Sequence, residues 1–336
     1  MPNSSFGTTG LIATTIERWI PTLVEQIFSS KPLLWALDRA GSVQNEPGGT
    51  SIVQPLIYGE SPNVGSYADY DVFSTDPNSG ISAAEFPWRQ FYGLLHISGI
   101  EMAMNSGEEA ILGLLESRGK QLQLSMSEEI ERQLFSDGSG NGGKDLDGIG
   151  AIVTAIDPSW GDLGGIDRPT YSYWRSTVKD HGGDNGTTAG LLQKNMANVY
   201  NTVSEGNEHP NFLVGTQEAF ELYETQLVDQ ARYTDMQMAD GGFQNLLFKG
   251  APFTFDAYAD RAFTEASAIA TAEDPIWFLN LDYLYLKKLA SVWFKPTDMK
   301  EPVNQDAYYK SLLCYGNMTT SNPSRQGVLY SVTVAA

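Results

Sequence analysis

The feature that most constrains the fold is one long stretch of helical pattern, residues 107–136. Ser106 can cap its start, and the glycine-rich run 137–143 ends it. At ~1.5 Å per residue, such a helix is roughly 45 Å long, which favours a scaffold for other elements over a catalytic pocket. Its apolar residues recur at steps of four, seven or eight, as on one stripe of a helix: Ile111, Leu115, Leu122, Met126, Ile130 and Leu134.

Composition and charge narrow the class of protein. The chain has 336 residues, 41% of them hydrophobic and 18% charged, which is typical of a folded protein with real cores. No apolar run reaches the ~18 residues that span a bilayer, and no secretory signal is visible, so we expect cytosolic synthesis and no membrane partner. A net charge of −20 disfavours nonspecific binding to nucleic acid, because phosphate neutralisation needs Lys and Arg.

The segments before the long helix suggest an arm and a projecting hairpin. Residues 1–45 form an apolar, partly helical arm, which Pro21 and Pro32 break into short pieces. Residues 46–85 are rich in turn formers, and a strand over 86–104 follows. Because a loop of about forty residues is improbable inside a compact domain, we expect a long β-hairpin that projects from the body. Both faces of the strand 86–104 are fairly apolar, which predicts a mostly buried middle.

The remainder of the chain reads as an α/β domain followed by strands. Within residues 145–295, the pattern predicts helices over 191–203 and 217–230. From residue 301 onward strand character returns. The predicted strands of the α/β domain are 211–215, 248–256 and 276–281.

This order of elements, together with several short segments, resembles the major capsid proteins of tailed phages, the Hong Kong 97 type. The resemblance covers about residues 45–330, and it rests on the order and spacing of the segments together. The segments are 88–92 (WRQFY), 144–149 (KDLDGI), 165–175 (GIDRPTYSYWR), 242–252 (GFQNLLFKGAP), 278–280 (FLN), 304–307 (NQDA), 316–322 (GNMTTSN) and 326–329 (QGVL).

The resemblance implies an α+β fold of the Hong Kong 97 capsid type. It also implies a structural protein without enzymatic activity or cofactor. Copies would self-assemble through pentamers and hexamers into an icosahedral shell, built in the host bacterial cytoplasm, that encloses double-stranded DNA without sequence-specific binding. The implied segments are an N-terminal arm (1–45), an extended loop called the E-loop with its base strands (46–100), a peripheral domain with the long spine helix (101–144), an axial domain (145–295) and a C-terminal return to the peripheral domain (296–336).

Partners and alternatives follow from the same comparison. Members with a fused scaffolding domain carry roughly a hundred extra residues before the arm, so we expect a separate scaffolding protein here. A portal is a further expected partner, and a decoration protein an optional one. Two alternatives remain open, an encapsulin-like cellular nanocompartment shell and an acidic soluble α/β hydrolase or binding protein.

One departure from the family concerns cross-linking. Some members join their subunits through a Lys–Asn isopeptide bond whose lysine lies on the E-loop. This chain has no lysine between Lys31 and Lys120. Arginine cannot replace the amine nucleophile, because it stays protonated. We therefore expect a shell without this cross-link.

Charged residues supply candidates for contact between subunits. The hypothesis is a complementary contact between the acidic E-loop and the basic positions of a neighbour's spine helix, which would set register more than affinity. The alternative is a solvated acidic loop. The candidates are Asp69, Asp71 and Glu85 on the E-loop, and Arg118, Lys120 and Arg132 on the spine helix.

Catalytic and metal motifs are missing from the sequence. Asp137, Ser139 and Asn141 match part of a calcium loop, but Gly148 stands where a bidentate Glu is required. The three histidines lack metal-ligand spacing, and none of the common catalytic signatures occurs. Cys314, the one cysteine, excludes an internal disulfide framework and is expected to be a small buried hydrophobe. Aromatic side chains expected in the core are Tyr171, Tyr173, Trp174, Trp277 and Phe278.

Overall fold

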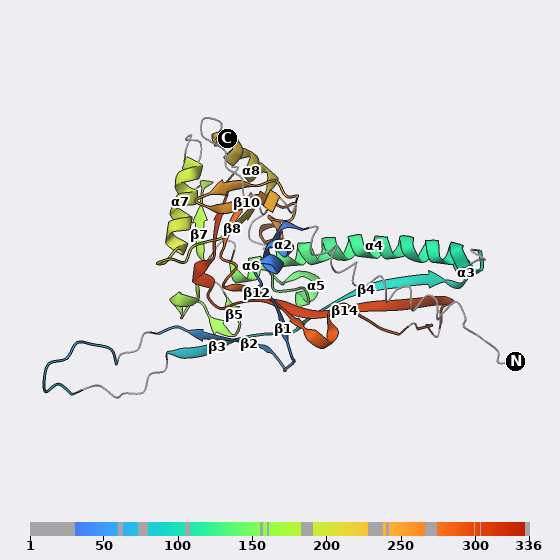
Figure 1. Cartoon of the computed structure of the whole chain (residues 1–336), viewed down its shortest axis with the longest axis horizontal. Helices are drawn as coiled ribbons and strands as arrows, with labels where there is room; N and C mark the ends of the chain where they lie inside the picture. Colours follow the sequence, from blue (N-terminus) through green and yellow to red (C-terminus); the bar gives the residue numbers. More distant parts are fainter. Residues whose placement is uncertain are drawn as a thin grey trace.

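The fold is a mixed α+β body from which two long features extend to opposite sides (Figure 1). One is a β-hairpin. The other contains the long helix, and we call it the helical arm; it is distinct from the predicted N-terminal arm. Two separate sheets form the body. The computed structural model describes residues 31–59, 63–72, 80–104, 108–154, 157–159, 161–182, 191–227, 238–239, 242–265, 274–298, 300–302 and 304–332.

A five-stranded sheet organises the arm side of the body. Its strands are β1 (Val43–Glu46), β12 (Leu284–Leu289), β14 (Ala307–Thr320) and β13 (Lys295–Pro296), with β4 (Arg89–Ser98) also paired to β14. β1 runs parallel to β12, and the other pairings are antiparallel. β4 and β14 pair from Ser98↔Ala307 to Arg89↔Gly316, and this ribbon extends along the arm beside the long helix (Figure 1).

The long helix α4 (Glu108–Leu134) has 27 residues and ends before the glycine-rich run, as predicted. Gly138, four residues after the end of the helix, has a φ of 81°, a left-handed conformation in which the chain turns away from the helix path. Met126, Ile130 and Leu134 are buried, which confirms the second half of the apolar stripe. Leu122 is half-buried. The cap Ser106 and the side chains of Ile111 and Leu115 lie outside the described residues.

A glycine lets the helix lie close on the ribbon. A Cβ built on Gly93 of β4 would meet the Sδ of Met126 at 2.4 Å. The bare backbone at this position therefore accepts the helix directly, and the thioether fills the space above it.

The predicted strand 86–104 is too long, because it ends at Ser98 and a helix α3 (Gly99–Met104) follows. Ser98 and Glu101 form a capping box at this junction. The Ser98 Oγ accepts from the Glu101 N–H at 3.3 Å, and the Glu101 Oε2 accepts from the Ser98 N–H at 3.2 Å. These bonds satisfy the first donors of the helix and so favour a turn away from strand geometry.

The predicted burial of both faces of this strand is also wrong. Residues of β4 alternate between buried and exposed, and Tyr92 is 70% exposed. His96 on the same face is exposed as well. The reason is that α4 covers one face of the ribbon, while the opposite face is exposed among the residues that the structure describes.

The second sheet has six strands in the order β7-β15-β11-β8-β10-β9. Every residue of β8 and β11 is buried, as expected for the central strands of a sheet. Helices α7 (Leu191–Val203) and α8 (Gln217–Gln226) pack their apolar stripes on it. The strands are β7 (Thr177–Asp180), β15 (Gly327–Tyr330), β11 (Ile276–Leu279), β8 (Phe212–Gly215), β10 (Ala251–Phe255) and β9 (Leu246–Phe248).

Predictions for this sheet hold with local corrections. The helix 191–203 matches α7, and α8 begins where predicted because the Thr216 side chain caps it through the Ala219 N–H. The predicted strand 248–256 is a hairpin of β9 and β10 instead. Lys249 and Gly250 have φ of 49° and 91°, which is typical of a tight turn between strands.

Short elements complete the body. Helix α2 buries Leu33, Leu34 and Leu37 in the core that also holds the end of α4. The end of the predicted arm is thus packed into the body, while its first thirty residues lie outside the described part. The short elements are α2 (Pro32–Arg39), α5 (Gly140–Gly143), α6 (Ile149–Ile152), β5 (Asp162–Leu163), β6 (Ile166–Asp167), η1 (Ser172–Trp174), α10 (Arg261–Glu265), η3 (Ala290–Val292) and η4 (Pro323–Arg325).

Two strands belong to a different sheet from the one that their position in the sequence suggested. β12 falls in the segment expected to be axial, but it pairs with β1 and β14. β15 falls in the segment expected to return to the peripheral domain, but it pairs with β7 and β11. Strand pairing of this kind joins residues far apart in sequence, so local patterns do not reveal it.

Candidate functional site

The projecting hairpin is the first candidate surface. Strands β2 (Ile52–Ile57) and β3 (Ile81–Phe86) pair antiparallel from Ile52↔Phe86 to Ile57↔Ile81, so a hairpin is present as predicted. Its returning strand is β3 rather than the predicted strand 86–104, whose β4 part pairs with β14. Its inner face lies on the main core through Ile52, Leu56, Ala84 and Phe86. Its outer face leaves three apolar side chains in solvent: Val53 is 51% exposed, Ile57 81% and Ile81 74%.

Backbone contacts fix the base of the hairpin to the body. The Glu85 N–H donates to the Gly164 carbonyl at 2.9 Å. Gly164 has a φ of 58°, and a Cβ there would lie 2.9 Å from the Ala84 Cβ. On the other side, the Trp88 Nε1 donates to the Gly49 carbonyl at 3.0 Å. The hairpin therefore leaves the body in a fixed direction.

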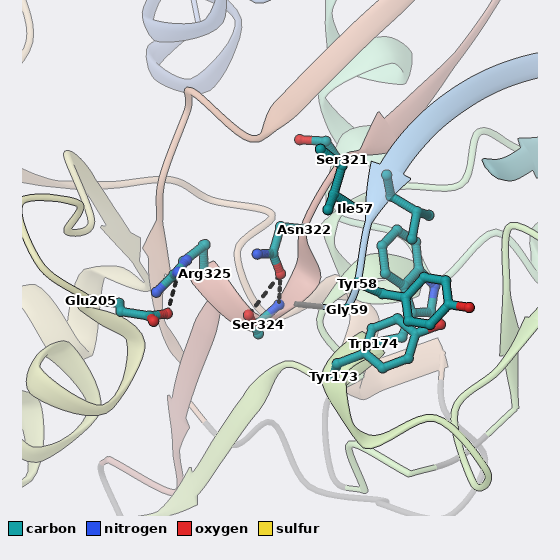
Figure 2. Close-up of a pocket in the computed structure, with 11 residues that line it drawn as sticks. Ile57, Tyr58, Gly59, Tyr173, Trp174, Glu205, Ser321, Asn322, Ser324 and Arg325 are labelled. Atoms are coloured by element: carbon teal, nitrogen blue, oxygen red, sulfur yellow. Dashed lines mark hydrogen bonds and ion pairs between the residues drawn. The ribbon is translucent and has the colours of Figure 1, made fainter. Parts of the chain in front are cut away.

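A pocket of about 370 Å³ opens where β2 ends (Figure 2). The ring of Tyr58 stacks on Tyr173, with centroids 5.1 Å apart and planes at 14°. Burial, and then Tyr58, raises the pKa of Tyr173. Across the pocket, Arg325 and Glu205 form an ion pair. Because the two charges of this ion pair neutralise each other, we interpret the pocket as a set of contacts that supports the base of the hairpin rather than as a catalytic centre.

The connection between β2 and β3 is exposed where the structure describes it. Asp71 organises a local turn, since its Oδ2 accepts from the Ala68 N–H at 2.8 Å. Asp69 beside it is exposed. Large apolar side chains surround these acids with little cover: Val64, Tyr67, Tyr70 and Val72. Exposed apolar side chains at this density mark a contact surface.

The hairpin that carries Asp69 and Asp71, and the part of α4 that carries Arg118 and Lys120, extend to opposite sides of the body. Figure 1 shows the hairpin extending from the body on one side and α4 on the other. Glu85 lies on the outer face of β3 and accepts from the Ser51 Oγ at 3.4 Å. Arg118 and Lys120 lie on α4 in the arm, so the hairpin of one chain does not reach them in the same chain.

Arg118 and Arg132, two of the basic candidates, form ion pairs within the chain. Arg118 binds Glu101 of α3 at 2.8 Å. Arg132 binds Glu129 and lies 3.7 Å from Asp145. Lys120 is exposed. Hydrogen bonding from Ser98, and then Arg118, lowers the pKa of Glu101.

The arm carries further exposed apolar side chains that sequence reasoning missed. Tyr92 and Leu94 lie on the face of β4 that α4 does not cover. Ile100 and Met104 on α3 and Leu124 on α4 are 66%, 77% and 64% exposed. The sequence signal was the apolar character of both faces of the strand, which indicates cover on both sides but does not say whether the chain or a neighbour supplies it.

The described part of the chain offers no metal or catalytic centre. Within it, no group of three or more His, Cys, Asp or Glu residues could hold a metal ion. Cys314 is buried in β14, as predicted, and burial raises the pKa of its thiol to about 12. Trp174, Trp277 and Phe278 are core residues as expected, but Tyr171 is 45% exposed and Tyr173 only partly buried.

None of the helices in the described ranges is long and apolar enough to cross a membrane.

Known structures decide the fold. No family model and no curated protein sequence matches the chain. A chain of the cyanophage A-1(L) capsid superposes with a TM-score of 0.61 at 16% identity, covering 87% of this chain and 91% of that one. A chain of the capsid of Myoviridae phage XM1 gives 0.52 at 11%, covering 86% and 88%. The chain has the Hong Kong 97-type capsid fold.

The Hong Kong 97-type fold is not restricted to phages. The encapsulin SrpI from Synechococcus elongatus PCC 7942 superposes with a TM-score of 0.51 at 8% identity, covering 89% of each chain. The projecting hairpin and the long arm therefore belong to a fold that both kinds of shell protein use.

Proposed function

We propose that this protein is the major capsid protein of a tailed phage, and that copies assemble into an icosahedral shell around double-stranded DNA. One observation carries the proposal. In a chain with the capsid fold, an apolar hairpin extends away from the chain's own helical arm, and the described part of that arm carries exposed apolar side chains. Two exposed apolar surfaces on opposite sides favour a head-to-tail contact, which closes into rings.

The parts of the fold receive roles on this proposal. The β2–β3 hairpin acts as the E-loop, and α4 with β4 and β14 forms the peripheral domain with its spine helix. The six-stranded sheet forms the axial domain around the ring centre. An isolated two-stranded hairpin is marginally stable in water, so cover from a neighbour's arm stabilises it. Asp69, Asp71 and Glu85 then set its register against Arg118, Lys120 and Arg132.

The shell on this proposal is not cross-linked by Lys–Asn isopeptide bonds. The support is the lack of any lysine between Lys31 and Lys120, a range that contains the whole hairpin. Purified particles boiled in SDS should run as a single 36.8-kDa band. A ladder of covalent multimers would contradict this part of the proposal.

An encapsulin-like nanocompartment is the second candidate, because SrpI shares the fold over 89% of this chain. The contents of purified particles separate the two. Nuclease-resistant double-stranded DNA inside the particles supports the phage capsid. A protein cargo with no protected DNA supports the nanocompartment. The phage reading also places a separate scaffolding protein, a portal and an optional decoration protein among the partners, and these should co-purify with immature or mature particles.

A further inference from the structure

A cluster of charged groups is buried where three distant segments meet. Lys31 precedes α2, Glu131 lies on α4, and Asp256 follows β10. They line a cavity of about 380 Å³. Glu131 is 2% exposed and Asp256 4%, so both carboxyl groups are almost fully removed from solvent. The cluster joins the root of the N-terminal segment to the long helix and to the six-stranded sheet.

Lys31 fixes the start of α2 through this cluster. Its ammonium group forms an ion pair with the Glu131 Oε2 and lies 6.0 Å from the centroid of the Tyr258 ring. Its carbonyl accepts from the Trp35 N–H at 2.9 Å, the first hydrogen bond of the helix. One residue therefore holds both the helix start and the buried acids.

The two carboxyl groups need a proton between them. The Asp256 Oδ1 accepts from the Tyr258 N–H at 2.9 Å. Its Oδ2 is buried and accepts no hydrogen bond from the described residues, and the Glu131 carboxyl lines the same cavity. Two buried carboxylates in one cavity repel unless a proton neutralises one of them. With one proton, the two acids and the Lys31 ammonium sum to zero charge, so no net charge is buried.

We propose that Lys31, Glu131 and Asp256 form a proton-dependent latch, which holds the root of the N-terminal segment and α2 against the long helix while the two carboxyl groups share one proton. Loss of that proton leaves a net negative charge in the cavity and weakens the latch. Lys31 and α2 are thereby held less firmly against α4 as pH rises.

The direction of the pH effect follows from the surroundings of Glu131. Burial, and then Asp256, raises the pKa of this carboxyl from 4.5 to about 9, against the opposing influence of Lys31. The folded state therefore keeps a proton that the unfolded chain releases. Its contribution to stability is complete below pH 4.5 and is lost as pH rises from 4.5 to about 9.

The other charged groups nearby do not replace this proton. Burial lowers the pKa of Lys31, but Glu131, Asp256 and Tyr258 outweigh burial and raise it overall, so the ammonium stays charged through the window. On α4, Glu129 pairs with Arg132, and Glu128 is exposed. The pH response is therefore expected from the two buried carboxyl groups.

The test is urea unfolding of the full chain at pH 5, 7 and 9, for wild type and for Glu131→Gln. The amide donates to Asp256 as the protonated acid does, but it has no proton to lose. The ratio of the wild-type to the variant folding constant should fall with rising pH, by up to tenfold per pH unit. A ratio that stays constant from pH 5 to 9 overturns the latch. Glu128→Gln is the matched control and should track wild type throughout.

Hydrogen exchange locates the effect and covers a variant that fails to fold. At pH 9, α2 should lose protection in wild type relative to Glu131→Gln, while α7 should not. Should Glu131→Gln not fold, Asp256→Asn removes the shared proton from the other carboxyl and should give the same flat pH response. A loss of protection spread evenly over α2 and α7 contradicts a local latch.

Discussion

At the scale of single residues, buried polar groups join elements that are distant in sequence. Asn317 is fully buried, and its Nδ2 donates to the Asp147 Oδ2 at 2.6 Å and to the Pro87 carbonyl at 3.0 Å. Arg89 donates to the other oxygen of Asp147 at 2.7 Å. The loop after α4 is thereby tied to β4 and β14. No periodic pattern marks such a residue, because its value lies in partners that only the fold brings near.

Gly164 should be intolerant of a side chain. Its φ of 58° disfavours L-residues, and an added Cβ would meet Ala84 at 2.9 Å. Gly164→Ala should lower the free energy of unfolding by about 1–3 kcal/mol, through backbone strain and displacement of the hairpin base. Urea unfolding measures this. Gly165→Ala next to it is the control for strain alone, because it has a φ of 73° and nothing within 4 Å of the added Cβ. An equal cost at both positions would refute the contact with the hairpin.

Cys314 should be inert while the protein is folded. Burial raises the pKa of its thiol to about 12, so almost no thiolate exists at neutral pH. The residue is also only 2% exposed. A thiol reagent at pH 8 should label the chain only after urea unfolding. Rapid, complete labelling of the native protein would contradict the burial.

At the scale of elements, sequence periodicity predicted those helices and strands whose formation depends on residues close together in the chain. Helix α7 and the second half of α4 follow their apolar stripes, and β8 follows its buried run. The end of β4 was predicted wrongly, although a Ser-x-x-Glu signal at Ser98 and Glu101 was present in the sequence. The uncovered face of β4 was missed for a different reason, since cover depends on which elements pack there.

The two faces of α4 should respond differently to truncation. Leu134 is fully buried, so Leu134→Ala should cost about 2–5 kcal/mol of unfolding free energy. Leu124 is 64% exposed, so Leu124→Ala should change it by no more than about 0.5 kcal/mol while impairing assembly. Urea unfolding and size-exclusion chromatography separate the two effects. Similar unfolding costs would mean that the helix packs differently.

Charge on the hairpin should affect assembly rather than folding. Asp69→Lys with Asp71→Lys should reduce particle yield strongly, because like charges would face Lys120 and its neighbours on the next subunit. The matched control is Asp69→Asn with Asp71→Asn, which keeps the acceptor for the Ala68 N–H and should be milder. Particle yield by sedimentation is the measurement, with circular dichroism as the folding check. A wild-type particle yield from the charge-reversed variant would mean that these acidic residues belong to a solvated loop and make no contact between subunits.

At the scale of the whole molecule, we interpret the hairpin and the helical arm as surfaces for contact between copies of the chain. The hairpin and the arm extend in opposite directions, and the described part of each carries exposed apolar side chains (Figure 1). The sequence predicted this outline through the order of its segments. It did not predict that β12 belongs to the five-stranded sheet and β15 to the six-stranded sheet, because those pairings join residues far apart in the chain.

The most direct test is electron microscopy of the purified full chain beside the variant Ile57→Asp with Ile81→Asp. These two residues pair on the outer face of the hairpin and are 81% and 74% exposed, so the change should leave circular dichroism and urea unfolding unaltered. Wild type should form rings of five or six subunits or closed shells, with the hairpin over the neighbour's arm, and the variant should remain dispersed. A monomeric wild type, or a variant that assembles equally well, would contradict the account.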